Sequence, residues 1–134
     1  MATLESIEGI GPAYAQKLKS VGVTTVEGLL KKGATPKGRQ EVAENSGISE
    51  KLVLEWVNHA DLFRIKGVGE EYADLLEAAG VDTVVELAQR KAENLLEKMT
   101  AINAEKKLVR RLPVLSQVQS WVEQAKQLPR IVTY

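Results

Sequence analysis

Apolar residues recur at helical spacing in short runs along the chain, and residues that start or end helices bound each run. In the run 12–21, a proline at the first position suits a helix start, and Gly22 ends the helix. The next apolar stripe follows residues 24–27, where a threonine cap has a glutamate three residues later, and it stops at Gly33. The pattern therefore predicts two short helices that are separated by only a few residues.

Two further helices complete the first half of the chain. Thr35 and Pro36 form a cap and first-position pair for a helix that ends at Gly47. Ser49 then caps a helix whose apolar stripe includes Trp56. We therefore expect four helices before the pattern begins again.

The second half of the chain repeats this order with less distinct boundaries. Residues 91–103 contain no Gly or Pro, so we expect Asn103 to act as a cap and Pro113 to end the element before it. No stretch shows the sustained alternation of a β-strand. The whole pattern predicts an all-α protein of about eight to ten short helices.

The chain contains an internal repeat. Residues 7–11 align with residues 65–69 at an offset of 58, and 11 of the 24 positions from 7 to 30 are identical. A second match at an offset of 65 aligns residues 56–60 with 121–125, so each half ends in the same kind of helix. The identical positions, numbered in the first copy, are Ile7, Gly9, Gly11, Tyr14, Ala15, Leu18, Gly22, Val23, Thr25, Val26 and Leu29.

The repeat predicts two copies of one unit, residues 1–64 and 65–134. The change of offset from 58 to 65 places about seven extra residues in the second copy, and we expect them around residues 110–113. No linker rich in Pro, Gly or Ser separates the halves, which favours two units packed as one compact domain.

Composition excludes most cofactor chemistry. The chain has 134 residues with 18 basic and 18 acidic side chains, one His and no Cys. Without cysteine there is no disulfide scaffold, thiolate zinc site or cysteine nucleophile, so we expect no cofactor and no metal. No apolar run is long enough to span a bilayer, and the first residues lack a basic and apolar leader pattern. We expect a cytoplasmic protein that is not an enzyme and has no membrane or small-molecule partner.

The repeated Gly-apolar-Gly segment carries the main chemical signal. Glycine adopts positive φ without strain, so the chain can turn sharply there while a buried Ile10 or Val68 anchors the turn. The backbone N–H groups after the second glycine open a helix, and such a helix start attracts anions because its donors are unpaired and its dipole end is positive. A DNA phosphate is an anion that such a site can hold.

The segment Ile-x-Gly-apolar-Gly-x-x-Tyr-Ala-x-x-Leu-x-x-x-Gly-Val, at residues 7–23 and 65–81, resembles the helix-hairpin-helix motif. The residues around 54–65 and 110–129 resemble a family of tandem helix-hairpin-helix proteins, domain of unknown function 4332. The resemblance implies two tandem units in a SAM-like fold with pseudo-two-fold symmetry. It also implies binding of duplex DNA across the minor groove through backbone phosphates, in some proteins with a monovalent cation held by hairpin carbonyls.

The charges around the two hairpins differ. Basic residues follow Gly11, whereas Glu70, Glu71 and further acidic residues follow Gly69, where carboxylates would repel a phosphate. The second hairpin, formed by Gly67, Val68 and Gly69, is therefore the weaker site. The expected nucleic-acid-binding residues of the first unit are Gly9, Ile10, Gly11, Ala13, Tyr14, Lys17, Lys19, Lys31, Lys32, Lys37 and Arg39.

Two function classes follow from this division. The first is a sequence-independent DNA-binding module whose hairpin amides contact phosphates. The second is a protein-interaction or scaffolding module in which the hairpins are structural and the acidic second unit meets a basic partner. The basic patch at 31–39 and a second at 106–111 are also compatible with ordinary solvated helix faces.

Several other side chains admit a functional and a structural interpretation. We expect Trp56 and Trp121 to fill the core rather than stack on bases, and His59 to form a structural hydrogen bond between the halves rather than act as a base. Tyr14 and Tyr72 either pack under the hairpins or reach a phosphate. The acidic residues at 70–86 are expected to favour helix starts rather than hold metal. The tail at 128–134 covers a core edge or pairs with another chain.

Overall fold

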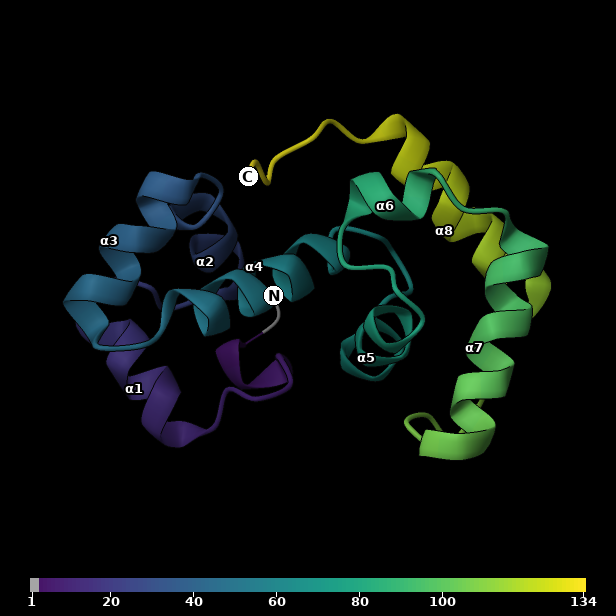
Figure 1. Cartoon of the computed structure of the whole chain (residues 1–134), viewed down its shortest axis with the longest axis horizontal. Helices are drawn as coiled ribbons and strands as arrows, with labels where there is room; N and C mark the ends of the chain where they lie inside the picture. The colour runs from purple at the N-terminus through teal and green to yellow at the C-terminus, as the bar shows by residue number, and fades with distance from the viewer. Residues whose placement is uncertain (1–2) are drawn as a thin grey trace. The chain divides into compact units, whose positions relative to one another are not determined.

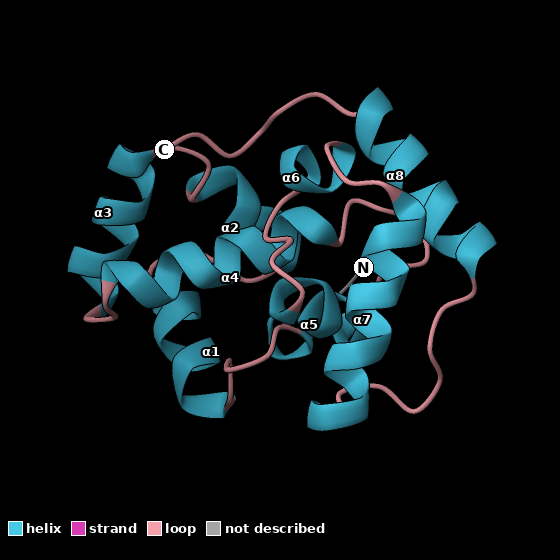
Figure 2. Ribbon diagram, turned by 45° about the vertical axis from the view of Figure 1, so that its right-hand side comes forward, coloured by secondary structure: helices cyan, strands magenta, loops and turns pink. Residues whose placement is uncertain are grey.

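The computed structural model describes residues 3–134, and within this range every regular element is a helix (Figure 2). The expectation of an all-α fold is confirmed, with eight α-helices and one 3-10 helix in the described part. No helix of residues 3–134 is long and apolar enough to cross a bilayer. The elements are η1 (Leu4–Ser6), α1 (Pro12–Ser20), α2 (Val26–Lys32), α3 (Pro36–Ser46), α4 (Glu50–Leu62), α5 (Glu70–Ala78), α6 (Val84–Ala88), α7 (Ala92–Lys106) and α8 (Leu115–Gln127).

The chain divides into two compact units. Figure 1 colours the chain by residue number, from purple near the N-terminus to yellow at the C-terminus. The first unit ends at Asp61 and also includes Ile131–Tyr134, while the second unit spans Leu62–Arg130. The sequence placed the boundary after residue 64 and assigned the whole C-terminal end to the second unit. The return of the last four residues to the first unit depends on contacts that are distant in sequence.

Helix starts of the first unit follow the expected cap chemistry. The Thr35 side chain accepts a hydrogen bond from the amide of Gly38, and Pro36 and Pro12 each occupy the first turn of a helix. At α2 the cap is Thr25 rather than Thr24, because the Thr25 hydroxyl accepts from the Gly28 amide at 3.0 Å. A capping hydroxyl satisfies one of the amides that the first turn leaves without a partner.

The repeat is visible in the element boundaries of the two units. Helix α5 begins and ends 58 residues after α1, and α8 begins and ends 65 residues after α4. Helix α7 has 15 residues where α3 has 11, and residues 107–114 connect α7 to α8 where only 47–49 connect α3 to α4. We call residues 107–114 the inserted loop. The extra length is thus shared between a helix and a loop rather than confined to residues 110–113.

Asn103 has a different role from the expected cap. Helix α7 continues through it to Lys106 and ends at Lys107, which adopts the left-handed conformation with φ 52°. The Asn103 side chain donates to the Val109 carbonyl at 3.2 Å and accepts from the Val109 amide at 2.9 Å. Asn103 therefore fixes the start of the inserted loop against the end of α7.

A tryptophan lies at the centre of each unit. Trp56 and Trp121 are each only 2% exposed, which confirms their expected place in the core. The Tyr14 ring meets Trp56 edge-on with centroids 5.0 Å apart, and the Tyr72 ring lies 5.1 Å from Trp121 in a tilted arrangement. Edge-to-face contacts of this kind stabilise aromatic pairs beyond the area they bury.

The C-terminal residues pack on the first unit as an extended segment. The Thr133 amide donates to the Ala34 carbonyl at 2.8 Å, Val132 is buried, and the Tyr134 hydroxyl bonds to the Asn58 side chain at 3.0 Å. Of the two roles expected for the tail, the structure shows the covering of a core edge.

Candidate functional site

The two hairpin turns, which we define as residues 7–11 and 65–69, have the same backbone geometry. Gly9 has φ 93° and Gly67 has φ 95°, a region that glycine adopts without strain. The Ile10 amide donates to the Ile7 carbonyl and the Val68 amide to the Ile65 carbonyl, both at 3.1 Å. The glycines are exposed while the apolar residues between them are buried, so each turn presents its backbone to solvent.

Each hairpin turn leads into a helix whose cap residue has no side chain. Gly11 caps α1 and Gly69 caps α5 in extended conformations, and neither start has a side-chain capping bond. The first amides of a helix have no acceptor within the helix, so those of Ala13 and Tyr14 remain donors for an external group. Both helix starts therefore keep the donor arrangement that favours an anion.

Lys17 lies on the helix that follows the first hairpin turn. Ala13 and Lys17 are four residues apart and share one face of α1. The Lys17 amine lies 5.7 Å from the centre of the Tyr14 ring, which fixes it on the side of the tyrosine. Ala13 is exposed, and no acidic residue occupies the first turn of α1.

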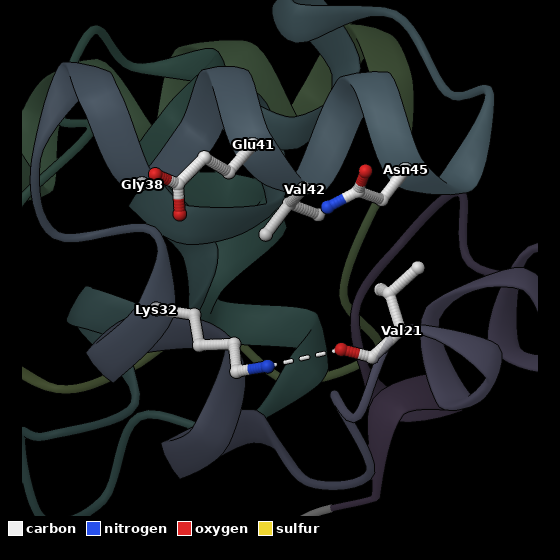
Figure 3. Close-up of a pocket in the computed structure, with 6 residues that line it drawn as sticks. All are labelled: Val21, Lys32, Gly38, Glu41, Val42 and Asn45. Atoms are coloured by element: carbon white, nitrogen blue, oxygen red, sulfur yellow. Dashed lines mark hydrogen bonds between the residues drawn. The ribbon is translucent and has the colours of Figure 1, made fainter.

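Lys32 is the last residue of α2, and its side-chain amine reaches the C-terminal end of α1, opposite the hairpin turn. Its amine donates to the Val21 carbonyl at 2.9 Å, beside a cavity of about 260 Å³ that Glu41 and Asn45 of α3 also line (Figure 3). Since nine helical residues span about 13 Å, this amine is a helix length from the hairpin amides. In the second unit Arg90, 58 residues after Lys32, donates to the Gly80 carbonyl at 3.0 Å, one position beyond the residue equivalent to Val21. A basic residue at this position closes the end of the preceding helix.

Arg39 is buried and not part of a basic surface. It is 6% exposed, and its guanidinium donates to the carbonyls of Gly33 at 2.9 Å and Thr133 at 2.7 Å. The ring of Tyr134 covers it at 5.7 Å. This corrects the expectation of a phosphate contact at Arg39, because its donors hold the C-terminal segment instead.

The remaining basic residues of the first unit are exposed. Lys31 ends α2 and Lys37 begins α3, so both lie near Lys32 in sequence and belong to the α2–α3 connection. Lys19 lies in the last turn of α1. Among the expected lysines, Lys17 contacts a residue of the first turn of α1, through the ring of Tyr14.

The second hairpin turn faces a hollow that sequence spacing does not reveal. A cavity of about 390 Å³ is lined by Gly67, Gly69 and the first turn of α5, together with Arg110 and Arg111 of the inserted loop. The Tyr72 hydroxyl donates to the Arg111 carbonyl at 3.0 Å and holds the loop there. The basic patch at 106–111 is the available signal, but nothing in the sequence indicates which hairpin it approaches.

Three other candidates have structural surroundings. The ring of Tyr14 packs on Trp56, and the Tyr72 hydroxyl is bonded to backbone, so both tyrosines support the hairpins. His59 is buried at 5% exposure, and its expected hydrogen bond between the halves stays a prediction. Within residues 3–134 no three His, Asp or Glu side chains gather closely enough to hold a metal ion.

Comparison with known proteins gives one family and one curated relative. The family model described as Domain of unknown function (DUF4332) matches residues 8–128. A poly(3-hydroxyalkanoate) polymerase subunit PhaC from Haloferax mediterranei is 46% identical over 56 residues. That match covers 42% of this chain but only 10% of the relative. No solved structure matches the chain significantly.

Proposed function

The chain belongs to the DUF4332 family, and on that premise we propose that it is a non-enzymatic, sequence-independent DNA-binding module. The observation that carries the proposal is the pair of hairpin turns with the same positive φ at Gly9 and Gly67 and the same uncapped helix starts. Backbone donors contact phosphates without reading bases, so binding of this kind has no sequence preference.

The proposal assigns the stronger contact to the first hairpin turn. The amides of Ala13 and Tyr14 supply the donors, and Lys17, one helical turn from Ala13, supplies a positive charge. Exposed Lys19, Lys31 and Lys37 add to the field of the first unit. Because the net charge of the chain is zero, such binding is weak and depends strongly on salt.

We further propose that the two units are tandem helix-hairpin-helix units, packed with pseudo-two-fold symmetry. The matching boundaries of α1 with α5 and of α4 with α8 support a duplicated unit. Two hairpins on one module can contact two phosphate groups of one duplex at once, which raises the overall affinity above that of either contact.

A protein-interaction module is the second candidate function, and one observation favours it. The match to the polymerase subunit covers 56 residues, close to the 58-residue spacing of the repeat. A segment of about one unit thus occurs within a much larger protein whose name refers to polymer synthesis. In this alternative the acidic first turn of α5 contacts a basic partner.

The test compares binding of a labelled short DNA duplex by fluorescence anisotropy at two salt concentrations. The informative variant is Ala13→Glu, which gives α1 the carboxylate that Glu71 supplies to α5 at the equivalent position. A first-turn carboxylate favours the helix dipole, so the fold is preserved while the phosphate is repelled. We expect the wild type to bind and Ala13→Glu to lose most of its affinity.

The matched control is Lys51→Gln, which also lowers the net charge by one; Lys51 is exposed in the first turn of α4, away from the hairpin turn in sequence. Its affinity is expected to stay near that of the wild type. Weak electrostatic association is strongest at low salt. If the wild type does not bind DNA under that condition, the DNA-binding proposal is wrong and the protein-interaction module is favoured.

A further inference from the structure

The inserted loop is folded onto the second unit by contacts along its length. The Asn103 side chain forms hydrogen bonds with the backbone amide and carbonyl of Val109, and the Tyr72 hydroxyl donates a hydrogen bond to the Arg111 carbonyl. At the far end, the Val114 amide donates to the Gln117 side chain at 2.8 Å. Val109 and Pro113 are buried, so the backbone of the loop is fixed while its arginines point outward.

Arg110 and Arg111 are exposed, and neither guanidinium has a hydrogen bond or ion pair with any residue of the range 3–134. They line the same hollow as Glu70 and Glu71 without forming a salt bridge to them. Guanidinium groups bind phosphates through two parallel hydrogen bonds, a geometry that lysine does not offer. Two unpaired guanidiniums beside a helix start are donors placed for an anion.

An indole N–H donor lies at the same turn. The Trp121 side chain is 2% exposed, and a Cβ on Gly67 would lie 3.0 Å from its Nε1 atom. Within residues 3–134 the indole N–H has no hydrogen-bond acceptor. No buried side-chain nitrogen or oxygen of the described residues lacks a hydrogen-bond partner, so this unbonded N–H reaches the surface at the turn, where an external acceptor can bind it.

We propose that the hollow at the second hairpin turn is a phosphodiester-binding site whose charge comes from Arg110 and Arg111 of the inserted loop. This inference rests on the proposed DNA-binding function and changes the role of the second unit within it. The loop supplies positive charge where the first turn of α5 supplies only Glu70 and Glu71. A duplex then meets a charged contact on each unit, Lys17 on the first and the arginine pair on the second.

A nucleic-acid phosphate fits the hollow better than an acidic membrane surface does. The exposed large apolar side chains of the loop and the start of α8 are Val114 and Leu115, at 54% and 36% exposure. Stable attachment to a membrane surface needs a broad apolar face, which two partly exposed side chains do not provide. Backbone amides and guanidiniums around a hollow suit a single phosphate group.

The experiment measures duplex affinity against salt for the wild type and three double variants. Arg110→Gln/Arg111→Gln removes both guanidiniums, and Lys106→Gln/Lys107→Asn removes two charges from the adjacent residues outside the hollow. Asn is chosen at residue 107 because it tolerates the left-handed conformation found there. The slope of log K against log salt changes by about 0.9 for each phosphate contact.

We expect the arginine variant to lose about 1.8 units of slope and on the order of 50-fold in affinity at about 0.1 M salt. The lysine control is expected to keep the slope nearly unchanged. Arg110→Lys/Arg111→Lys should keep most of the slope but bind more weakly, because the charge remains and the paired hydrogen bonds do not. Equal urea midpoints for all variants would show that the fold is intact.

Three results would overturn the inference in distinguishable ways. Wild-type binding with an unchanged slope in the arginine variant removes the second site but leaves the proposed function standing. Equal losses in the arginine and lysine variants reduce the loop to a general positive field. No duplex binding by the wild type removes both proposals, and retention of the wild type on phosphatidylserine vesicles would then identify a membrane surface instead.

Discussion

The two units share a skeleton and differ in the chemistry of their helix starts. After the hairpin turn, the first unit has Pro12, Ala13 and an exposed Lys17, and the second has Glu70 and Glu71 at the first two of these positions. The residue equivalent to Lys17 in the second unit is Leu75, which is fully buried. The shared residues are those that the turn and core require, whereas the residues facing solvent have diverged in charge.

This difference separates what holds the unit together from what it can bind. The positive φ glycines, the threonine caps and the Tyr–Trp pairs occur in both units and pack in the same way. Charge around the hairpin is supplied by α1 in the first unit and by the inserted loop in the second. A repeat can therefore keep its fold while each copy obtains its ligand contacts from a different segment.

The strongest test of the shared skeleton removes the central ring of each unit. Trp56→Ala and Trp121→Ala each delete a fully buried ring, and each should lower the free energy of unfolding by about 3–5 kcal/mol. Urea denaturation followed by circular dichroism measures both. A loss in one unit much smaller than in the other would show that the two cores are not equivalent.

The next effect concerns the glycines at positive φ. Gly9→Ala and Gly67→Ala place a Cβ 3.3 Å and 3.0 Å from a tryptophan Nε1 in a strained backbone conformation, and each should cost about 1–3 kcal/mol. Gly11→Ala and Gly69→Ala are the controls, since a Cβ there meets nothing within 4 Å and neither φ is positive. Thermal denaturation should show shifts for the first pair only, and equal shifts for all four would refute the role of positive φ.

A third change tests a feature that only the first unit has. Arg39→Met leaves the carbonyls of Gly33 and Thr133 without their donor and should cost about 1–3 kcal/mol. In a chain that lacks residues 131–134 the same substitution should cost less, because the contact to Thr133 is already gone. The slope of DNA binding against salt should not change, and a clear decrease would restore Arg39 as a phosphate contact.

The smallest expected effect comes from removing part of the charge difference between the starts of α1 and α5. Glu71→Ala gives the second helix start the residue that the first has at the equivalent position. Loss of one carboxylate near a bound phosphate should tighten duplex binding by about fivefold, the effect of about 1 kcal/mol. Fluorescence anisotropy at low salt measures it. Weaker binding would instead indicate that the carboxylate contacts a basic group of the partner.

The sequence by itself determined the helical fold class, the repeat and most helix starts. These follow from short-range signals, because a cap, a proline at the first turn or a glycine at positive φ acts within a few residues of itself. The central place of Trp56 and Trp121 followed equally from helical spacing in an apolar stripe.

Only the tertiary structure decided which segments the basic side chains contact. Lys32 caps the end of α1, Arg39 is enclosed by the C-terminal segment, and Arg110 with Arg111 reaches the second hairpin turn. Each of these contacts joins residues between 11 and 94 positions apart. Charge patterns along a chain do not encode such distances, because the packing of buried apolar faces brings these segments together and the exposed side chains follow them.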